Sequence, residues 1–322
     1  MQAIDEVAQL EEAGERLKLL LVCTHPALDP AIRTPLMLQV VLGIDAARIA
    51  SAFLVARAAM SQRLVRAKSK IREARIPFTI PAIEDLPDRL EAVFEAVYAA
   101  FSLVWDAAPG SDHAQRGLVN EAIALARLLV RLLPKEPEAM GLLALMLHCE
   151  ARREARRNIH GHYVPLADQD RALWSLPMIA EAESLLRLTA TSNAPGRFQW
   201  EAAIQSAHNL TAAGGTPPLR EIGLLHRELL ARAPSVGGCV AYAAALLQGG
   251  DAHDALEVLE GLPTARVLSF QPFWVVRASV MKAIGRENEA RDAAQRAIGL
   301  TQDDAIRQFL LETHRETKAR KP

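Results

Sequence analysis

Helix-breaking residues interrupt this chain at intervals of about 20 to 40 residues, and the stretches between them have helical patterns. The breaks are at 109–110, 134–137, 158–169, 193–196, 214–218, 234–238 and 262–263. Alanine and leucine, both strong helix formers, account for 57 and 45 of the 322 residues, whereas aromatic residues make up 5%. An all-β fold would require more valine, threonine and aromatic residues. The sequence therefore predicts an all-α chain built from helical hairpins.

Positive charge is concentrated in one segment of a chain whose formal net charge is −1. Residues 57–75 contain seven Lys and Arg against Glu73 alone, which excludes a uniformly basic coat but not a local basic patch. Directly after this segment, Pro77, Pro81 and Pro87 end any helix and force extended backbone. We therefore expect a domain boundary here, with one domain over 1–80 and a second over 81–322.

Residues 30–75 have the layout of a helix-turn-helix. We predict a first helix over 30–42 that Gly43 closes, and a second over 46–53 that Asp45 caps. A short turn then leads into the basic helix. The residues predicted to face a shared core are Ile32, Leu36, Leu38, Val41, Ile49, Ala50, Phe53, Met60, Leu64, Ala67 and Ile71.

The cations of the basic helix fall on a different, solvent-facing side from its apolar stripe. A major groove admits one α-helix, and basic side chains supply phosphate contacts there. We predict that Gln62 and Arg63 read base edges, while Arg66, Lys68 and Lys70 contact phosphates. The alternative is an ordinary amphipathic helix whose charged face is only solvated.

Several stretches resemble the region-4 module of extracytoplasmic-function-type RNA polymerase sigma factors, in the subgroup with a tetratricopeptide-like C-terminal extension. They are 14–28 (GERLKLLLVCTHPAL), 49–55 (IASAFLV), 60–72 (MSQRLVRAKSKIR) and 76–78 (IPF), followed by 142–147 (LLALML), 168–174 (DQDRALW), 196–199 (GRFQ) and 202–204 (AAI). The resemblance implies recognition of a promoter −35 element.

The sequence departs from this pattern in two places. Nothing here corresponds to region 2, which binds polymerase core and melts the −10 element. We therefore expect either a fragment of a longer factor or a stand-alone relative that needs a partner to supply region 2. The basic helix also begins at Ala56 and Arg57, where such modules usually place a capping Ser or Thr and an acid. Arg57 opposes the positive helix end but is placed to contact a phosphate.

The C-terminal part matches the pattern of tetratricopeptide units, in which small residues lie where two helices cross. One unit is indicated by Trp274, Ala278, Met281, Ala290, Ala294 and Ala297, with Gly285 and Asn288 in its turn. A preceding unit is indicated by Ala243, Leu246, Ala255 and Leu259, with Gly249 and Gly250 in its turn, and a weaker one by Ala122, Ala126, Leu129 and Pro134. Such arrays bind protein segments, although this one could instead only buttress the N-terminal module.

Two polar segments interrupt the helical pattern. Asp168, Asp170, Arg171 and Trp174 form a candidate cluster for a partner or ligand. The structural alternative is that an Asp of this cluster caps the following helix, Arg171 pairs with an acid and Trp174 joins the core. Upstream, His160 and His162 flank Gly161 in a predicted β-hairpin or ordered loop, as a metal half-site or as two exposed turn histidines.

Enzyme and compartment signals are weak. No nucleotide-binding, zinc-protease or hydrolase motif occurs, so we expect no catalytic activity, cofactor or metal. Cys23, Cys149 and Cys239 form no CxxC, which argues against a disulfide framework. No signal peptide is evident, and no apolar run reaches the roughly 20 residues of a spanning helix. We expect a cytoplasmic protein without a membrane partner.

The leading hypothesis is a sigma-factor-like transcription regulator. Its partners would be promoter DNA, RNA polymerase and a protein bound by the helical-repeat domain. One alternative is a helical-repeat interaction scaffold with a vestigial DNA-binding module, and another is a small-molecule sensor with its pocket near residues 168–174.

Overall fold

The computed structural model describes residues 14–53, 55–82, 84–105, 113–190, 195–210, 218–301 and 303–319. Within them, regular secondary structure is helical apart from one isolated antiparallel bridge between Arg157 and Tyr163, which confirms the predicted all-α class. The chain divides into two compact units, Met1–Met146 and Leu147–Pro322, and the boundary falls inside helix α7 (Pro137–Glu150). None of the helices in the described ranges is long and apolar enough to cross a bilayer.

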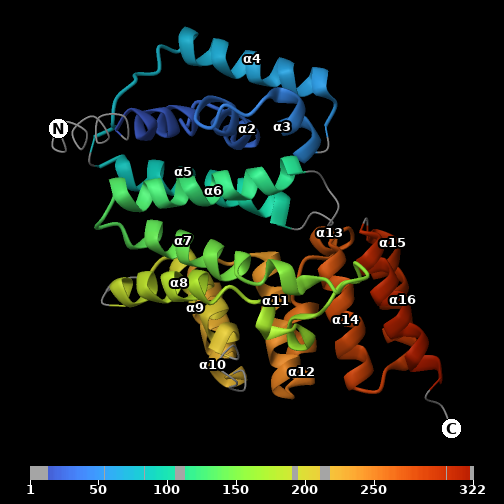
Figure 1. Cartoon of the computed structure of the whole chain (residues 1–322). Helices are drawn as coiled ribbons and strands as arrows, with labels where there is room; N and C mark the ends of the chain where they lie inside the picture. The colour runs from blue at the N-terminus through green and yellow to red at the C-terminus, as the bar shows by residue number, and fades with distance from the viewer. Residues whose placement is uncertain are drawn as a thin grey trace. The chain divides into compact units, whose positions relative to one another are not determined.

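The N-terminal unit begins with a helical segment over 14–23, followed by α2 (Pro30–Val40), α3 (Ala46–Ala52) and α4 (Arg57–Glu73). These three labelled helices contact one another, and α2 also contacts α5 (Leu86–Trp105), so that α2 lies between α4 and α5 (Figure 1). Most of the predicted core residues are buried, namely Ile32, Leu36, Leu38, Ile49, Ala50, Met60, Leu64 and Ala67. Val41, Phe53 and Ile71 are half-buried because they lie at or just beyond helix ends.

Local hydrogen bonds explain where α2 and α3 start. Asp29 Oδ1 accepts from the amide of Ala31 at 2.9 Å, which caps α2. Asp45 Oδ1 accepts from the amides of Ala47 and Arg48 at 2.9 and 3.0 Å, as predicted from the sequence. These bonds satisfy amides that have no partner within the helix. Gly43, with φ of 66°, makes the reversal between the two helices.

A proline-containing segment over 74–85 connects α4 to α5 within the N-terminal unit. Helix α5 then pairs with α6 (His113–Leu132). Their facing sides bury Val93, Val97 and Phe101 from α5 and Ala122, Ala126 and Leu129 from α6. Helix α7 follows after the break at 133–136, and all of its residues from 141 to 148 are buried.

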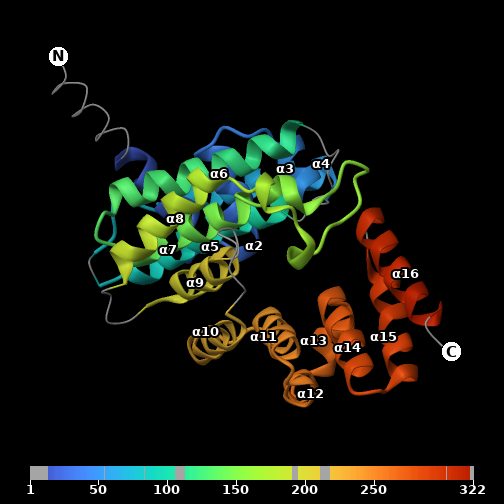
Figure 2. The same cartoon turned by 60° about the horizontal axis from the view of Figure 1, so that its bottom comes forward.

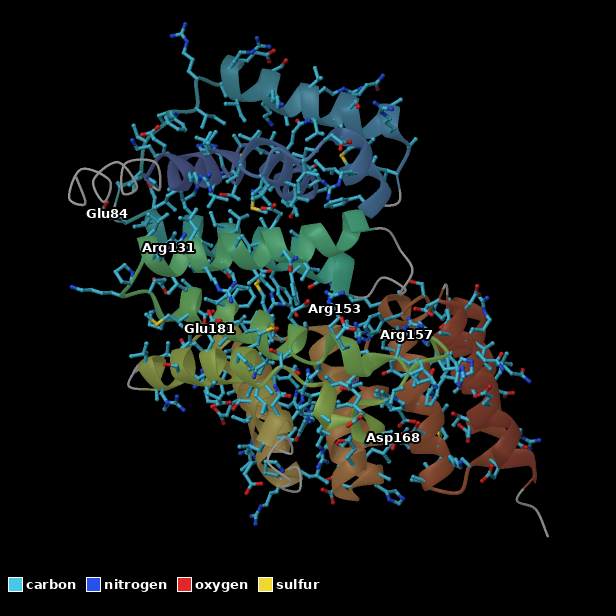
Figure 3. The ribbon with its side chains drawn as sticks, in the orientation of Figure 1. Glu84, Arg131, Arg153, Arg157, Asp168 and Glu181 are labelled. Atoms are coloured by element: carbon cyan, nitrogen blue, oxygen red, sulfur yellow. The ribbon has the colours of Figure 1, made fainter. Side chains whose placement is uncertain are left out.

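Between α7 and α8 (Leu176–Thr189) the chain forms three short 3₁₀ helices and one tight turn. The 3₁₀ helices are η1 (Arg153–Arg156), η2 (Leu166–Asp168) and η3 (Arg171–Leu173). The turn is closed by the Arg157–Tyr163 bridge, in agreement with the hairpin or ordered loop expected here. Figure 3 labels Arg157 and Asp168 on this segment. Arg157 pairs with Asp303, and Tyr163 packs edge-on against Phe309 at 5.4 Å, so this segment contacts the end of the chain.

The C-terminal unit continues as a succession of helices in which neighbours along the chain pack together (Figure 2). After α8 these are α9 (Arg197–Asn209), α10 (Leu219–Arg232), α11 (Val236–Gly249), α12 (Ala252–Glu260), α13 (Thr264–Val267), α14 (Gln271–Ala283), α15 (Glu287–Leu300) and α16 (Asp304–Ala319). Contacts between α12 and α14 and between α11 and α14 join successive pairs into one array.

Alanine residues lie at the contacts of this array, as the sequence pattern predicts. Ala243, Ala255 and Ala297 are fully buried, and Ala290 is 8% exposed. On α15, Ala293 is buried in place of the predicted Ala294, which is half-buried. Gly250 and Gly285 adopt φ values of 97° and 81°, which makes the reversals at the predicted turns sterically accessible. Small side chains at these crossings let helix backbones approach closely.

Candidate nucleic-acid interface

Helix α4 is 17 residues long and packs through one narrow stripe. Met60, Leu64 and Ala67 are 1%, 2% and 6% exposed, at the i, i+4 and i+7 spacing that was predicted. Helix α4 packs on α2 and α3, which places this stripe against the core of the N-terminal unit. The opposite side of α4 is therefore available to solvent.

The two ends of α4 differ in how well they are stabilised. Ala56, with φ of −61° and ψ of 137°, offers no side-chain cap, and no acid occupies the first turn. At the other end, Lys70 and Arg72 lie in the last turn, where positive charge interacts favourably with the helix dipole. Arg75 then adopts φ of 48°, and the Ile76 amide donates to the Ile71 carbonyl at 3.1 Å to close the helix. The N-terminus is thus the weaker end.

Every residue predicted to contact DNA is exposed on α4. These residues are Arg57, Gln62, Arg63, Arg66, Lys68 and Lys70. Within the part of the chain that the structure describes, the five cations among them make no ion pair or hydrogen bond to another side chain. The backbone amides of Arg48 and Ala47 lower the pKa of the Asp45 carboxyl, and the charge of Arg57 is close enough to add to this effect. A row of exposed cations on one helix attracts a polyanion.

Helical geometry separates these side chains into a central face and two flanks. At about 100° per residue, Gln62, Val65 and Arg66 lie opposite the buried stripe. Val65 is 63% exposed, which is unusual for a large apolar side chain beside a basic face. The sequence reasoning overlooked Val65 because it followed charge alone, although the helical phase of Met60 and Leu64 already indicated it.

The flank of α4 that faces α2 forms one wall of a groove of about 450 Å³. Arg63 and Lys70 line it from this flank, together with Ala67, and Arg66 reaches it from the edge of the central face. The other wall is formed by Leu28, Asp29, Ala31 and Ile32 at the start of α2. Arg57 and Lys68 lie on the opposite flank of α4. The predicted residues are therefore distributed over the whole exposed half of the helix, with Arg63 on a flank rather than at its centre.

The second predicted cluster does not form one surface. Asp168, Asp170 and Arg171 are exposed, whereas Trp174 is only 5% exposed. Asp170 Oδ1 accepts from the Ala172 amide at 2.9 Å and caps η3, and the guanidinium of Arg152 lies 6.0 Å from the centre of the Trp174 ring. Asp170 and Trp174 are therefore engaged in local structure.

A buried polar network that the sequence did not indicate joins α7 to α9. Arg152, 6% exposed, donates to Asn209 Oδ1 at 3.0 Å and to Gln205 Oε1. Asn209 Nδ2 lies 2.9 Å from Nδ1 of the fully buried His148. Since Asn209 donates to Nδ1, the neutral His148 ring carries its proton on Nε2, which faces Glu183 Oε1 at 3.6 Å. The network therefore connects the end of α7 and Arg152, just after it, to α9, and Glu183 of α8 lies beside it.

Burial controls the protonation of the histidines in this region. It is the main reason why the pKa of His148 is lowered to about 3, and the positive charge of Arg152 adds to the effect. Burial likewise lowers the pKa of His208 and of His226 to about 4. All three are therefore neutral near pH 7. Among the residues that the structure describes, no group of three or more His, Cys, Asp or Glu is placed to hold a metal ion.

The fold and this site define an all-α protein with a basic helix displayed from its N-terminal unit. Residues 89–190 match a family described as a family of unknown function, DUF6596. This match spans α5 to α8, so it lies outside the basic helix.

The chain belongs to the same family as an uncharacterized protein of Rhizobium meliloti (strain 1021). The two sequences are 39% identical over 284 residues, which cover 88% of this chain and 67% of the relative. No solved structure matches the chain.

Proposed function

We propose that this protein is a sigma-factor-like transcription regulator that binds the −35 element of promoter DNA through α3 and α4. The observation that carries the proposal is the exposed cationic half of α4, opposite a stripe that packs on α2 and α3. The resemblance of residues 49–55 and 60–72 to sigma region 4 supports the same assignment.

The arrangement of side chains suggests how α4 would dock. A helix of 17 residues is about 25 Å long, enough to lie in a major groove. The central residues Gln62, Val65 and Arg66 would then face base edges. Arg66 suits guanine, and the exposed Val65 suits a thymine methyl group, since apolar contacts distinguish thymine in the major groove.

The flanking cations would contact the two phosphate backbones. Arg63 and Lys70 project on the side of α2, and Arg57 and Lys68 on the other side. Four such contacts predict that the logarithm of affinity falls with the logarithm of salt with a slope of about −3 to −4. In this role Arg57 serves the interface, which accounts for a cation at the unfavourable end of α4.

The helical-repeat unit would supply the regulatory contact, with a protein partner or RNA polymerase. A groove of about 430 Å³ lies in this unit between α13 and the α14–α15 pair. Trp274, Arg277 and Arg296 line it, and Leu268, also in the lining, is 54% exposed. Tryptophan and arginine are enriched at protein interfaces, although Glu260, Glu289 and Asp292 also line this groove.

The decisive experiment is selection of bound sequences from a random duplex library, followed by fluorescence anisotropy with the enriched duplex. The double variant Arg63→Ala/Arg66→Ala should bind at least about tenfold more weakly than the unmodified protein. The matched control is Arg220→Ala/Arg227→Ala, which removes two exposed arginines from α10. Failure to enrich any sequence, or equal loss in both variants, would contradict the proposal.

The uncapped start of α4 favours one competing function, a helical-repeat interaction scaffold with a vestigial DNA-binding module. A DNA-reading helix is expected to be held firmly, and Ala56 gives no such support. This alternative predicts a stable protein partner together with DNA binding no stronger than to a scrambled duplex. Affinity capture with the full chain, with and without added duplex, distinguishes the two.

A further inference from the structure

The turn between η1 and η2 displays two imidazoles at its tip. His160 and His162 are both exposed, and their ring centroids are 6.1 Å apart with an angle of 47° between the ring planes. No ring nitrogen of either residue makes a hydrogen bond or ion pair within the described part of the chain. Both side chains are therefore free to bind a ligand.

The backbone beneath these rings is held by several hydrogen bonds. Asn158 Oδ1 accepts from the amides of both His160 and His162, at 2.9 and 3.0 Å. The Asn158 amide in turn donates to the His162 carbonyl at 3.0 Å. Gly161, with φ of 78°, supplies the left-handed residue that this tight reversal needs. The two imidazoles thus project from a preorganised turn.

The base of the turn is attached to the end of the C-terminal unit. Arg157 forms its ion pair with Asp303 and also donates to the Gly161 carbonyl at 3.2 Å. Tyr163 packs against Phe309 on α16. The Arg157 guanidinium is therefore paired with a carboxylate, so its charge opposes a cation at the tip only weakly.

We propose that His160 and His162 form half of a zinc site that the same pair from a second copy of the chain completes. Neutral imidazole is a favoured ligand of Zn²⁺, with Zn–N distances of about 2.0–2.1 Å. Two imidazoles bound to one tetrahedral ion have centroids about 5 Å apart. Exposed histidine side chains reach this separation from 6.1 Å by small rotations about χ1 and χ2.

Two observations assign the remaining ligands to a second copy. The described residues contain no group of three potential ligands, so among them the turn supplies two. Structural zinc sites have four protein ligands, and a twofold axis through the ion provides the other two. Ile159, between Asn158 and His160, is 96% exposed, and an opposing turn would cover this apolar side chain. The inference is independent of DNA binding.

The test is light scattering on the full chain during titration with ZnCl₂. The mass should double as half an equivalent of zinc is added, and EDTA should reverse the change. His160→Ala and His162→Ala should each abolish the zinc-dependent dimer. The matched control, His253→Ala, removes an exposed histidine from α12 and should dimerise normally.

Two further measurements keep the assignment falsifiable. Circular dichroism confirms that the variants are folded, as expected for exposed turn residues. Substitution with Co²⁺ should give a tetrahedral visible spectrum without a thiolate charge-transfer band, which excludes Cys239 as a ligand. A mass that does not change with zinc, a stoichiometry of one ion per chain, or a dimer that survives both His→Ala changes would overturn the proposal.

Discussion

Two arginines illustrate how differently the N-terminal and C-terminal units use the same side chain. Arg66 on α4 is exposed and has no ion pair within the described residues, whereas Arg152 is 6% exposed and hydrogen-bonded to Asn209 and Gln205. Removing Arg66 leaves only solvated groups behind. Removing Arg152 leaves the buried oxygen of Asn209 and the half-buried oxygen of Gln205 without this donor, which costs more free energy. The comparison separates a side chain that serves binding from one that serves the fold.

The largest expected effect is the loss of stability on replacing the buried Arg152. Arg152→Ala should lower the free energy of unfolding by about 3 kcal/mol, because it breaks a buried hydrogen-bonded network and leaves space beside Trp174. Arg66→Ala should change it by less than about 0.5 kcal/mol. Urea denaturation followed by circular dichroism measures both. Equal unfolding free energies for the two variants would contradict the claim that Arg152 stabilises the fold and Arg66 does not.

Acid should weaken the same network. An unfolded chain protonates His148 near pH 6.5, whereas the folded protein does so only near pH 3. The neutral His148 therefore contributes to the free energy of unfolding above pH 6.5. This contribution is lost as the pH falls from 6.5 toward 3. We expect a loss of about 1.5 kcal/mol between pH 6.5 and pH 5.

The variant His148→Gln isolates this contribution, because glutamine does not titrate in the range. Its unfolding free energy should fall less steeply over that range than that of the unmodified protein, when both are measured by urea titration at each pH. Parallel pH profiles for the two proteins would show that His148 is not responsible for the loss.

On the exposed side, two cations of α4 should behave differently. Arg66→Ala should weaken binding to the preferred duplex by about tenfold and relax its sequence preference, since Arg66 lies on the central face. Lys68→Ala should weaken binding to all sequences alike and make the salt slope shallower by about 1 unit. Anisotropy titrations at several salt concentrations test this, and identical behaviour of the two variants would argue against the docking described above.

The smallest expected effect concerns the start of α4. Ala56→Ser adds a side-chain acceptor at an exposed, extended N-cap position and should raise the unfolding free energy by about 0.5–1 kcal/mol. Ala56→Val serves as the control, because valine supplies no such acceptor and ranks with alanine at N-cap positions. A serine variant no more stable than the valine variant would mean that solvent already satisfies these amides.

Features encoded within a few residues could be predicted from the sequence. The cap at Asp45 and the buried stripe of Met60, Leu64 and Ala67 depend only on spacing along one helix. The same holds for the reversals at Gly250 and Gly285. These predictions succeeded because helical periodicity and capping are local properties.

Features that depend on helix packing could not be predicted. The partners Arg152 and Asn209 are 57 residues apart, and His148 and Asn209 are 61 residues apart, so no local pattern connects them. The burial of Ala293 in place of Ala294 depends on the rotation of α15 against its neighbours. For the DNA-binding prediction, the sequence supplied the exposed residues and their helical phase, whereas the groove between α4 and the start of α2 required the packing of the two helices.

The alanines at the helix crossings also constrain how this protein diverges from its relatives. A position such as Ala297, with no exposed surface, has no room for a larger side chain unless two helices move apart. Exposed positions on the same helix, such as Arg291 and Gln295, carry no such restriction. Exposed positions can therefore change, and with them the surface offered to a partner, while the spacing of the helices stays the same.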